Sequence, residues 1–399
     1  MLKINYKFII LMVIAYIFAY MQGGNLPYTF FYTFAVTFVV ACILSIIYLI
    51  NIKVSVNIAD REFFCGVEEP LIINIKNKGI FFIPYLIIKN NALQTLFSNY
   101  SGEILSLRYG EEVDLKYNMK FSIRGIYNLG SFIIWVRDLF GVLDLKREED
   151  KNKSIKVYPK IYSIDEKIFK GNDIFKNTFR SKSSIEDTYA TRDMRKYQEG
   201  DSLRRINWKV SAKQQELYIK NYETVSGEEF ALFLDMNEVN YTLDAKGIKE
   251  EMMIDFALSL IATMTNRAIE MKLLLNNKLG TSFNIEEKED FQKIMDFFLL
   301  EKSNGNNTMI DFMRKNINKL KTKSGVGIIT SRTSEALVNY IIEIKEKGYG
   351  IVLFIAEENE VSDKYKDVLK KLDINCYNIK SLLKEEEDEN ITFEEVVAR

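Results

Sequence analysis

The chain has 399 residues, a length that allows two or three domains at roughly 150 residues each. Hydrophobic residues make up 47% and charged residues 27%, which excludes a mainly disordered, collagenous or disulfide-scaffold protein. The formal net charge is -1, so no global charge attracts nucleic acid and we expect no nucleic-acid partner. The sequence contains no histidine, which excludes Ser-His and Cys-His nucleophile pairs, His-ligated zinc and an imidazole base. We therefore expect a protein that is not an enzyme.

Residues 1–50 predict a membrane hairpin of two helices. Their only charged residues are Lys3 and Lys7, and a short polar turn separates the apolar stretches 8–21 and 26–50. The second stretch exceeds the ~20 residues that cross a ~30 Å hydrocarbon layer, and the first reaches that length when the residues just before it are included. A cleaved signal peptide is the alternative, although no A-x-A-like site follows the first stretch. Lysines flank the outer ends and not the turn, which predicts a two-pass cell-membrane protein with cytoplasmic domains.

The next segment, residues 51–160, predicts an antiparallel β-sandwich of the immunoglobulin-like kind. Apolar and polar residues alternate with period two, as over 115–124, so each strand buries one face. The run Asp138-Leu139-Phe140-Gly141 predicts a turn, in which Asp138 binds backbone donors and Gly141 takes a positive φ. We interpret this turn as a structural corner.

A basic, glycine-punctuated run follows the sandwich pattern. Gly200 is suited to a turn, and Asp201 is the predicted N-cap of a short helix. The guanidinium groups of Arg195 and Arg204 lie near that helix start in sequence and can hold a carboxylate, either of this protein or of a partner. Trp208 is interpreted as a packing anchor rather than as a platform for a ligand.

This run resembles the signature of the domain-of-unknown-function 58 (DUF58) family, which reads approximately R-x-Y-x-x-G-D-x-x-R-x-I-x-W-x-x-S-A-[RK]. The resemblance implies a membrane protein with a von Willebrand factor A-like domain, in a family frequently linked to MoxR-type AAA+ ATPases and to transglutaminase-like membrane proteins. We take seven of the matching residues as the predicted interaction site. They are Arg195, Tyr197, Gly200, Asp201, Arg204, Trp208 and Lys213, and the match also includes Ile206, Ser211 and Ala212.

The C-terminal half predicts an α/β domain with a parallel, Rossmann-like sheet. Short apolar runs alternate with helical patterns, which is typical of a sheet with helices on both faces. Ligands of such sheets bind beyond the carboxyl ends of the strands, so Asp235 and Ser331 are the positions of interest. The predicted strands are 230–234, 271–275, 326–330 and 351–355, and the predicted helices are near 247–270, 287–301, 334–347 and 362–372.

The resemblance also implies a place for a divalent metal. Von Willebrand factor A domains hold the ion with D-x-S-x-S after the first strand, a distant Thr and a later Asp, a set of oxygen ligands that suits Mg²⁺. Here Asp235 matches and Asn237 offers an amide oxygen, but Val239 offers no donor atom and Thr330-Ser331-Arg332 contains no carboxylate. We therefore expect no cofactor, with Mg²⁺ at Asp235 and Asn237 as the open alternative.

Three functional hypotheses remain. The first is a membrane-anchored scaffold that binds protein partners, a AAA+ ATPase and other membrane proteins, at the lipid bilayer in envelope-related assembly. The second is a metal-dependent ligand-binding or hydrolytic domain that uses Asp235 with other carboxylates such as Asp244, Asp255 or Glu238. The third is an adhesin-like ectodomain that faces outward. The predicted division is a hairpin at 1–50, a sandwich at 51–160, a connector with the signature at 161–225, the von Willebrand factor A-like domain at 226–380 and an acidic tail at 381–399.

Overall fold

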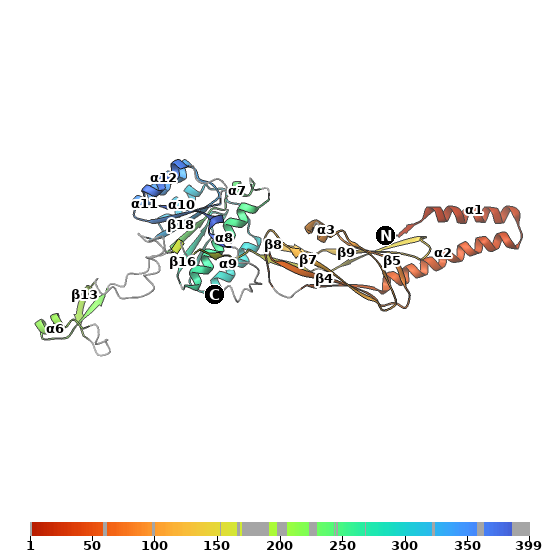
Figure 1. Cartoon of the computed structure of the whole chain (residues 1–399), viewed down its shortest axis with the longest axis horizontal. Coiled ribbons are helices and arrows are strands. Elements are labelled where there is room, and N and C mark those ends of the chain that lie inside the picture. Colours follow the sequence, from red (N-terminus) through yellow and green to blue (C-terminus); the bar gives the residue numbers. More distant parts are fainter. Residues whose placement is uncertain are drawn as a thin grey trace. The chain divides into compact units, whose positions relative to one another are not determined.

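The computed structural model divides into two compact units, residues Met1–Val157 and Tyr158–Arg399, which are described separately. Figure 1 shows the elements of both along the chain. The structure describes residues 2–58, 62–97, 100–151, 153–165, 168–169, 191–197, 206–222, 230–242, 244, 246–267, 269–320, 324–356 and 363–384.

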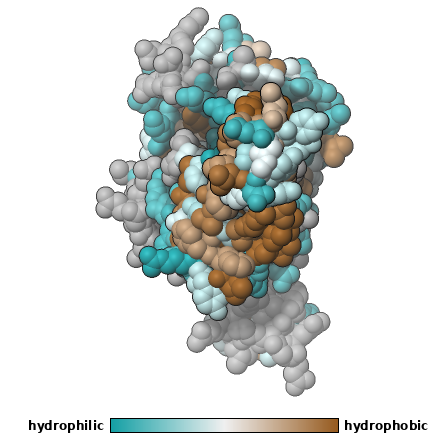
Figure 2. Space-filling view, turned by 90° about the vertical axis from the view of Figure 1, so that its right-hand side faces the viewer, coloured by the Kyte–Doolittle hydropathy of each residue, from teal (hydrophilic) through white to brown (hydrophobic). Residues whose placement is uncertain are grey.

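The first unit begins with two apolar helices that run antiparallel to each other. They are α1 (Tyr6–Gln22) and α2 (Asn25–Asn51). Aromatic rings join them, with Phe8 6.0 Å from Phe34 and Tyr16 5.3 Å from Phe31. Among the described residues, α2 is the one helix that is long and apolar enough to cross a membrane. Figure 2 shows apolar side chains gathered on the end of the unit that these helices form. Exposed apolar residues of the two helices include Ile10, Ile14, Phe18, Phe30, Val36 and Ile43.

A β-sandwich follows α2 directly. A five-stranded antiparallel sheet has the order β1-β10-β9-β5-β6, and a three-stranded antiparallel sheet has the order β2-β4-β7. The predicted alternation is confirmed in β2, where Ile52, Val54 and Val56 are buried. The strands are β1 (Leu2–Ile4), β2 (Ile52–Ile58), β4 (Glu68–Asn77), β5 (Ile83–Asn90), β6 (Glu103–Leu107), β7 (Glu112–Lys120), β9 (Ser131–Arg137) and β10 (Leu143–Asp150).

One apolar core joins these sheets. Side chains of both contribute to it, such as Ile73 of β4 and Ile134 of β9, together with Tyr48 of α2. The end of α2 is therefore part of the sandwich core, while the rest of the helix is more exposed. The remaining elements of the unit are β3 (Phe63–Phe64), α3 (Asn91–Leu96), β8 (Gly125–Asn128) and β11 (Ser154–Tyr158), and β3, β11 and β8 form a small sheet.

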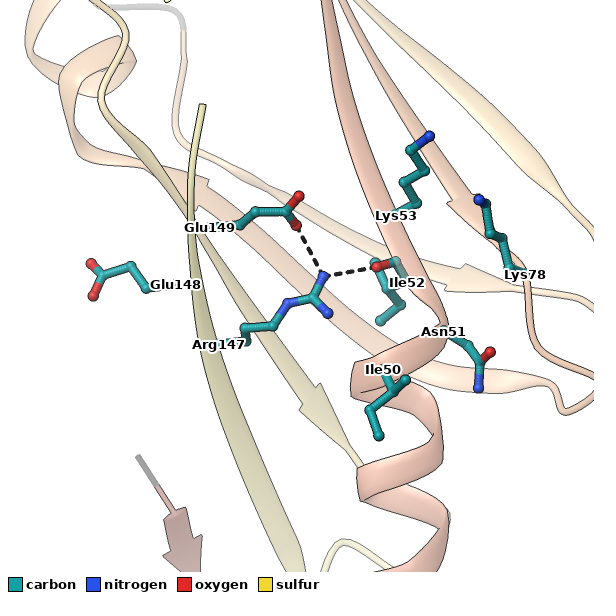
Figure 3. Close-up of a pocket in the computed structure, with 8 residues that line it drawn as sticks. All are labelled: Ile50, Asn51, Ile52, Lys53, Lys78, Arg147, Glu148 and Glu149. Carbon is teal, nitrogen blue, oxygen red and sulfur yellow. Dashed lines mark hydrogen bonds and ion pairs between the residues drawn. The ribbon is translucent and has the colours of Figure 1, made fainter. Parts of the chain in front are cut away.

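Arg147 of β10 binds the carboxyl end of α2. Its guanidinium donates to the carbonyl oxygens of Leu49 at 2.7 Å and Ile52 at 2.8 Å, and it pairs with the carboxylate of Glu149 at 3.0 Å. Helix C-termini leave carbonyl groups unpaired and carry partial negative charge. A cationic guanidinium there donates hydrogen bonds to the carbonyl groups and also offsets the negative charge. Figure 3 shows Arg147 between Glu149 and Ile52 in a pocket with mixed charge. This contact fixes the helix to the sandwich.

The second unit is built on a six-stranded sheet of order β17-β16-β15-β18-β19-β20. All neighbouring pairs are parallel except β16 with β17, which is antiparallel. The four predicted strands are therefore parallel as predicted, and the antiparallel edge strand β17 was not predicted. β17 is short and partly polar, and it lacks the continuous apolar run by which buried strands are recognised. The strands are β15 (Phe230–Leu234), β16 (Met271–Leu275), β17 (Ser282–Ile285), β18 (Gly325–Thr330), β19 (Gly350–Ile355) and β20 (Asn375–Asn378).

Helices cover both faces of this sheet, as predicted. Phe233 of β15 packs with Phe312 and the residues of α10 and α11 on one face, and Phe354 of β19 meets Phe256 of α8 at 4.7 Å on the other. The predicted helices are confirmed to within a few residues at their ends, and α10 was not predicted. The helices are α7 (Glu238–Thr242), α8 (Ile248–Asn266), α9 (Lys288–Leu300), α10 (Met309–Ile317), α11 (Glu335–Glu346), α12 (Asp363–Lys371) and the 3-10 helix η2 (Ile379–Ser381).

Two small sheets complete the second unit. One pairs β12 (Ser163–Ile164) with β21 (Leu383–Lys384), and the other pairs β13 (Thr191–Lys196) with β14 (Tyr218–Tyr222). The short helix α6 (Trp208–Gln214) lies between β13 and β14 in the chain. The described part of the signature therefore lies in the end of β13 and in α6, and β13 pairs with β14, which follows α6.

Candidate functional site

Three polar side chains meet where neighbouring strands of the six-stranded sheet end. Asp235 follows β15, Asn276 follows β16, and Thr330 is the last residue of β18. They are 7%, 0% and 1% exposed. β15 and β18 are the strands at which the order of the sheet reverses, the place where open α/β sheets bind ligands. This polar cluster is the first candidate site, and it includes the predicted residue Asp235.

The three side chains bind one another. One carboxylate oxygen of Asp235 accepts from the Thr330 hydroxyl at 2.9 Å. The other accepts from the Asn276 amide at 3.2 Å and from the backbone N–H of Asn237 at 3.3 Å. These hydrogen bonds compensate for the burial of a polar side chain. The Asp235 carboxylate therefore connects the ends of three strands.

The segment 301–308 lies against this cluster. The backbone of Gly305 exchanges hydrogen bonds with Met236 and Glu238, both at 2.8 Å. The carbonyl oxygen of Asn307 accepts from the side-chain amides of Asn237 at 2.8 Å and Asn276 at 3.0 Å. Gly305 approaches so closely that a Cβ atom there would lie 1.9 Å from the Asn276 carbonyl oxygen. The backbone of this loop thus pairs with the segments that follow β15 and β16.

The described contacts of Asp235 offer few oxygen ligands to Mg²⁺. That ion needs near-octahedral oxygen ligands, whereas the hydrogen bonds described for the Asp235 carboxylate come from two N–H groups and from the Thr330 hydroxyl. The side-chain oxygen of Asn237 already accepts from the Val239 backbone at 2.9 Å. Within the described ranges, no group of three or more Cys, Asp or Glu side chains is close enough together to hold a metal ion. The geometry supports a structural role for this carboxylate.

Two carboxylates of the second hypothesis have hydrogen-bond partners of their own, and the third is exposed. Asp244 accepts from the backbone N–H groups of Lys249 and Glu250 at the start of α8. Asp255, on α8, accepts from the backbone of Lys160 at 3.0 Å. Glu238 is exposed on α7. The structure therefore does not gather these residues into one reactive centre.

The second candidate site is the signature, whose described part presents an exposed tryptophan. Trp208 is the first residue of α6 and is 67% exposed, so its interpretation as a packing anchor is wrong. Leu217, just before β14, is 42% exposed. Ser211, the serine of the motif, accepts from the backbone N–H of Tyr218 at 2.9 Å and so joins α6 to β14. Tryptophan is frequent among residues that dominate binding at protein interfaces.

The described helix α6 has its own N-cap. The side chain of Asn207 accepts from the backbone N–H of Val210 at 3.4 Å, and Ile206 makes a β-bridge just before it. Asparagine is a good N-cap. The predicted cap Asp201 lies outside the described residues, so it stays a prediction. Lys213 lies in the last turn of α6, where a cation is favourable.

The other predicted signature residues are placed only in part. Gly200, Asp201 and Arg204 lie outside the described residues. Arg195 is described by its backbone in β13, where it pairs with Ile219. Tyr197 is described beside it, and its backbone N–H donates to Leu217 at 2.8 Å. Nearby, the carboxylate of Glu216 accepts from Lys196 and raises the pKa of that ammonium group.

Sequence analysis missed Asn276 and Asn307, which complete the polar cluster. Asn276 directly follows an apolar run that was predicted as a strand, so the rule that selected Asp235 also selects it. Asn307 lies in an asparagine-rich loop with no periodic pattern, and its contribution is a backbone carbonyl that no side-chain motif predicts.

The described fold thus comprises one long apolar N-terminal helix, β-sheets and a later α/β region. The family described as "Protein of unknown function DUF58" matches residues 193–352, and this match supports the DUF58 family for the chain. The matched segment includes the described part of the signature and the polar cluster. No curated protein matches this chain.

Several solved structures resemble parts of the chain. The CARDB domain of a Pyrococcus furiosus protein in complex with di-metal ions is 16% identical, covers 27% of this chain and 86% of its own, and has a TM-score of 0.18. Proximal thread matrix protein 1 from the mussel byssus is 13% identical, covers 43% and 45%, and has a TM-score of 0.27. A β-glucosidase from Listeria innocua in complex with gluconolactone is 12% identical, covers 27% and 16%, and has a TM-score of 0.14. These scores are too low to inform function.

Proposed function

We propose that the protein is a membrane-anchored scaffold that binds other proteins through its signature. The observation that carries this proposal is the exposed Trp208 on α6, in a segment whose helix and strand are held together by Ser211. An exposed indole suits recognition of a protein surface. In the polar cluster, in contrast, the Asp235 carboxylate accepts hydrogen bonds from Thr330, Asn276 and Asn237. We therefore favour binding over metal-dependent chemistry.

The proposal includes two membrane passes. α2 has 27 residues, and its last part packs in the sandwich core, as Tyr48 shows. α1 is preceded by β1, which pairs with β10 of the same sandwich, while α2 continues directly into β2. All strands of the sandwich must lie on the same side of a membrane. The chain leaves the sandwich after β1 through α1 and returns to it at β2 through α2. If α2 crosses the bilayer, α1 therefore crosses it too.

The proposed orientation is cytoplasmic for both units. Lys3 lies in β1 and Lys53 in β2, both at the sandwich end of the helices, and Lys7 lies in the first turn of α1. The opposite end, at Gly23 and Gly24, carries no charge. The positive-inside tendency then places the sandwich in the cytoplasm.

We also propose a von Willebrand factor A-like identity for the second unit and an immunoglobulin-like one for the sandwich. The von Willebrand factor A-like identity is supported by the strand order of the sheet, which is 3-2-1-4-5-6 when the strands are numbered along the chain, with one antiparallel edge strand. The immunoglobulin-like identity is supported by two antiparallel sheets around one core.

The proposed partner is a MoxR-type AAA+ ATPase in envelope-related assembly, the class that the family resemblance implies. The test is affinity purification of the full chain from gently solubilised native membranes. Trp208→Ala should lose the partner, whereas Leu279→Ala, which removes an 86% exposed side chain elsewhere in the second unit, should keep it. Equal recovery of the same proteins with both variants would refute a role for the signature.

A further inference from the structure

The turn between β9 and β10 carries two exposed apolar side chains on a rigid base. Leu139 and Phe140 are 56% and 55% exposed. Asp138, only 3% exposed, accepts from the backbone N–H groups of Phe140 and Leu143, each at 2.6 Å. Gly141 completes the turn with φ of +65°, a conformation that glycine adopts without strain. The buried carboxylate therefore holds both apolar side chains outward.

This turn is bonded to the beginning of α1. The backbone N–H of Asn5 donates to the carbonyl of Val142 at 2.9 Å, and its side chain donates to the carbonyl of Gly141 at 3.2 Å. The same side chain is the N-cap of α1, accepting from Lys7 at 3.2 Å. The apolar tip and the first turn of α1 consequently form one rigid element.

The depth of this rigid element relative to a membrane follows from the way in which α1 pairs with α2. Phe8 contacts Phe34 and Phe38, so α1 begins opposite the middle of α2 and not opposite its end. The 17 residues of α1 span about 25 Å, which is ~5 Å less than a ~30 Å hydrocarbon layer. In a two-pass arrangement, the start of α1 therefore lies at the boundary between acyl chains and headgroups.

The residues at this level have the chemistry of a membrane interface. Tyr6 begins α1 and is 66% exposed, and aromatic residues are enriched at such boundaries. Lys3 and Lys7 are exposed on either side of it. Their charges complement anionic lipid phosphates.

We infer that the β9–β10 turn is a lipid-contacting loop: Leu139 and Phe140 insert into the headgroup boundary beside α1, where Lys3 and Lys7 bind anionic lipid phosphates. The apolar tip supplies hydrophobic surface at the place where α1 is short. This inference rests on the proposed two-pass anchoring and adds a second, peripheral contact to it.

A depth measurement with spin labels tests the inference. The full chain, with Cys42, Cys65 and Cys376 replaced by serine, is reconstituted in vesicles of phosphatidylcholine and phosphatidylglycerol. A nitroxide is attached in three separate variants, Phe140→Cys in the turn, Phe30→Cys in α2 and Ile126→Cys in β8. Residues 30 and 126 are 63% and 42% exposed, so all three labels replace accessible side chains. Thermal melting of each labelled protein verifies folding before collision rates with oxygen and with a water-soluble nickel chelate are compared.

The inference predicts that oxygen collisions prevail at positions 140 and 30, and that nickel collisions prevail at position 126. Nickel-dominated collisions at 140 with oxygen-dominated collisions at 30 would overturn the inference and leave the anchoring intact. Nickel-dominated collisions at 30 would overturn the anchoring, and the inference with it. Dipolar broadening at 140 that disappears on dilution with unlabelled protein would mean that a second copy covers the turn, which also overturns the inference.

Discussion

Replacing Thr330 by valine removes one hydrogen bond from the Asp235 carboxylate with little change in shape, and it also removes the weaker contacts of this hydroxyl with the Arg332 backbone at 3.1 and 3.3 Å. The Thr330 hydroxyl lies 2.9 Å from the carboxylate and is 1% exposed, so water cannot take its place without a rearrangement. A hydrogen bond to a charged acceptor contributes about 1.5–3 kcal/mol, and the added methyl group returns less than ~1 kcal/mol. We expect Thr330→Val to lower the local stability of the sheet edge by about 2 kcal/mol.

Hydrogen exchange measures this change in the full chain. A loss of about 2 kcal/mol raises the opening equilibrium roughly 30-fold, so the protected amides at the strand ends should exchange about that much faster. The informative amides are those of Asp235 and Asn276, which donate to Ile329 at 2.9 Å and to Leu234 at 3.0 Å.

Thr263→Val is the matched control. The Thr263 hydroxyl donates to the backbone carbonyl of Ser259 at 2.8 Å, one turn earlier in α8, so the same chemical change removes a bond to a neutral acceptor. It should cost well under ~1.5 kcal/mol. If Thr330→Val has no larger effect than Thr263→Val, the view of Asp235 as a buried, internally bonded carboxylate is refuted.

Three more outcomes follow from the structure. Asn276→Asp would place a second carboxylate beside Asp235, where the amide now lies at 3.2 Å. This change should lower the stability of the second unit by about 3 kcal/mol, and added Mg²⁺ should restore part of the loss. An unchanged melting temperature without metal would contradict this expectation. Arg147→Met should weaken the junction of α2 with the sandwich by about 2 kcal/mol because the carbonyls of Leu49 and Ile52 lose their donor, which faster exchange at the end of α2 would reveal. Burial and the nearby carboxylate of Glu103 raise the pKa of Tyr100 to about 12. The contribution of Tyr100 to stability should therefore be intact below the usual tyrosine pKa of ~10 and lost as the pH rises to about 12. A titration of tyrosinate absorbance with a parallel stability measurement checks this pH range.

Buried strands of the second unit could be predicted from the sequence because they are continuously apolar. The runs that became β15 and β16 were predicted with their observed bounds. β17 could not be predicted in this way, since it lies at the sheet edge and alternates polar with apolar residues. Local pattern thus predicts strands that are buried on both faces, and edge pairing depends on tertiary contacts.

The candidate sites were predictable to a smaller extent. Asp235 was selected from its position after a strand, but its partners Asn276 and Thr330 become neighbours only through the strand order of the sheet. The exposure of Trp208 was not predictable because the same residue pattern fits a buried anchor and a surface contact. The exposure of a side chain depends on which residues pack against it in the folded protein, and the residues next to it in the sequence do not reveal these neighbours.

Photo-crosslinking at Trp208 in native membranes tests the central claim most directly. A photoreactive phenylalanine analogue in place of Trp208 should yield a discrete adduct with another protein, and the same analogue at Leu279, 86% exposed, should not. No adduct at 208 in membranes where the protein is folded and present, or identical adducts at both positions, would contradict a scaffold that binds through its signature.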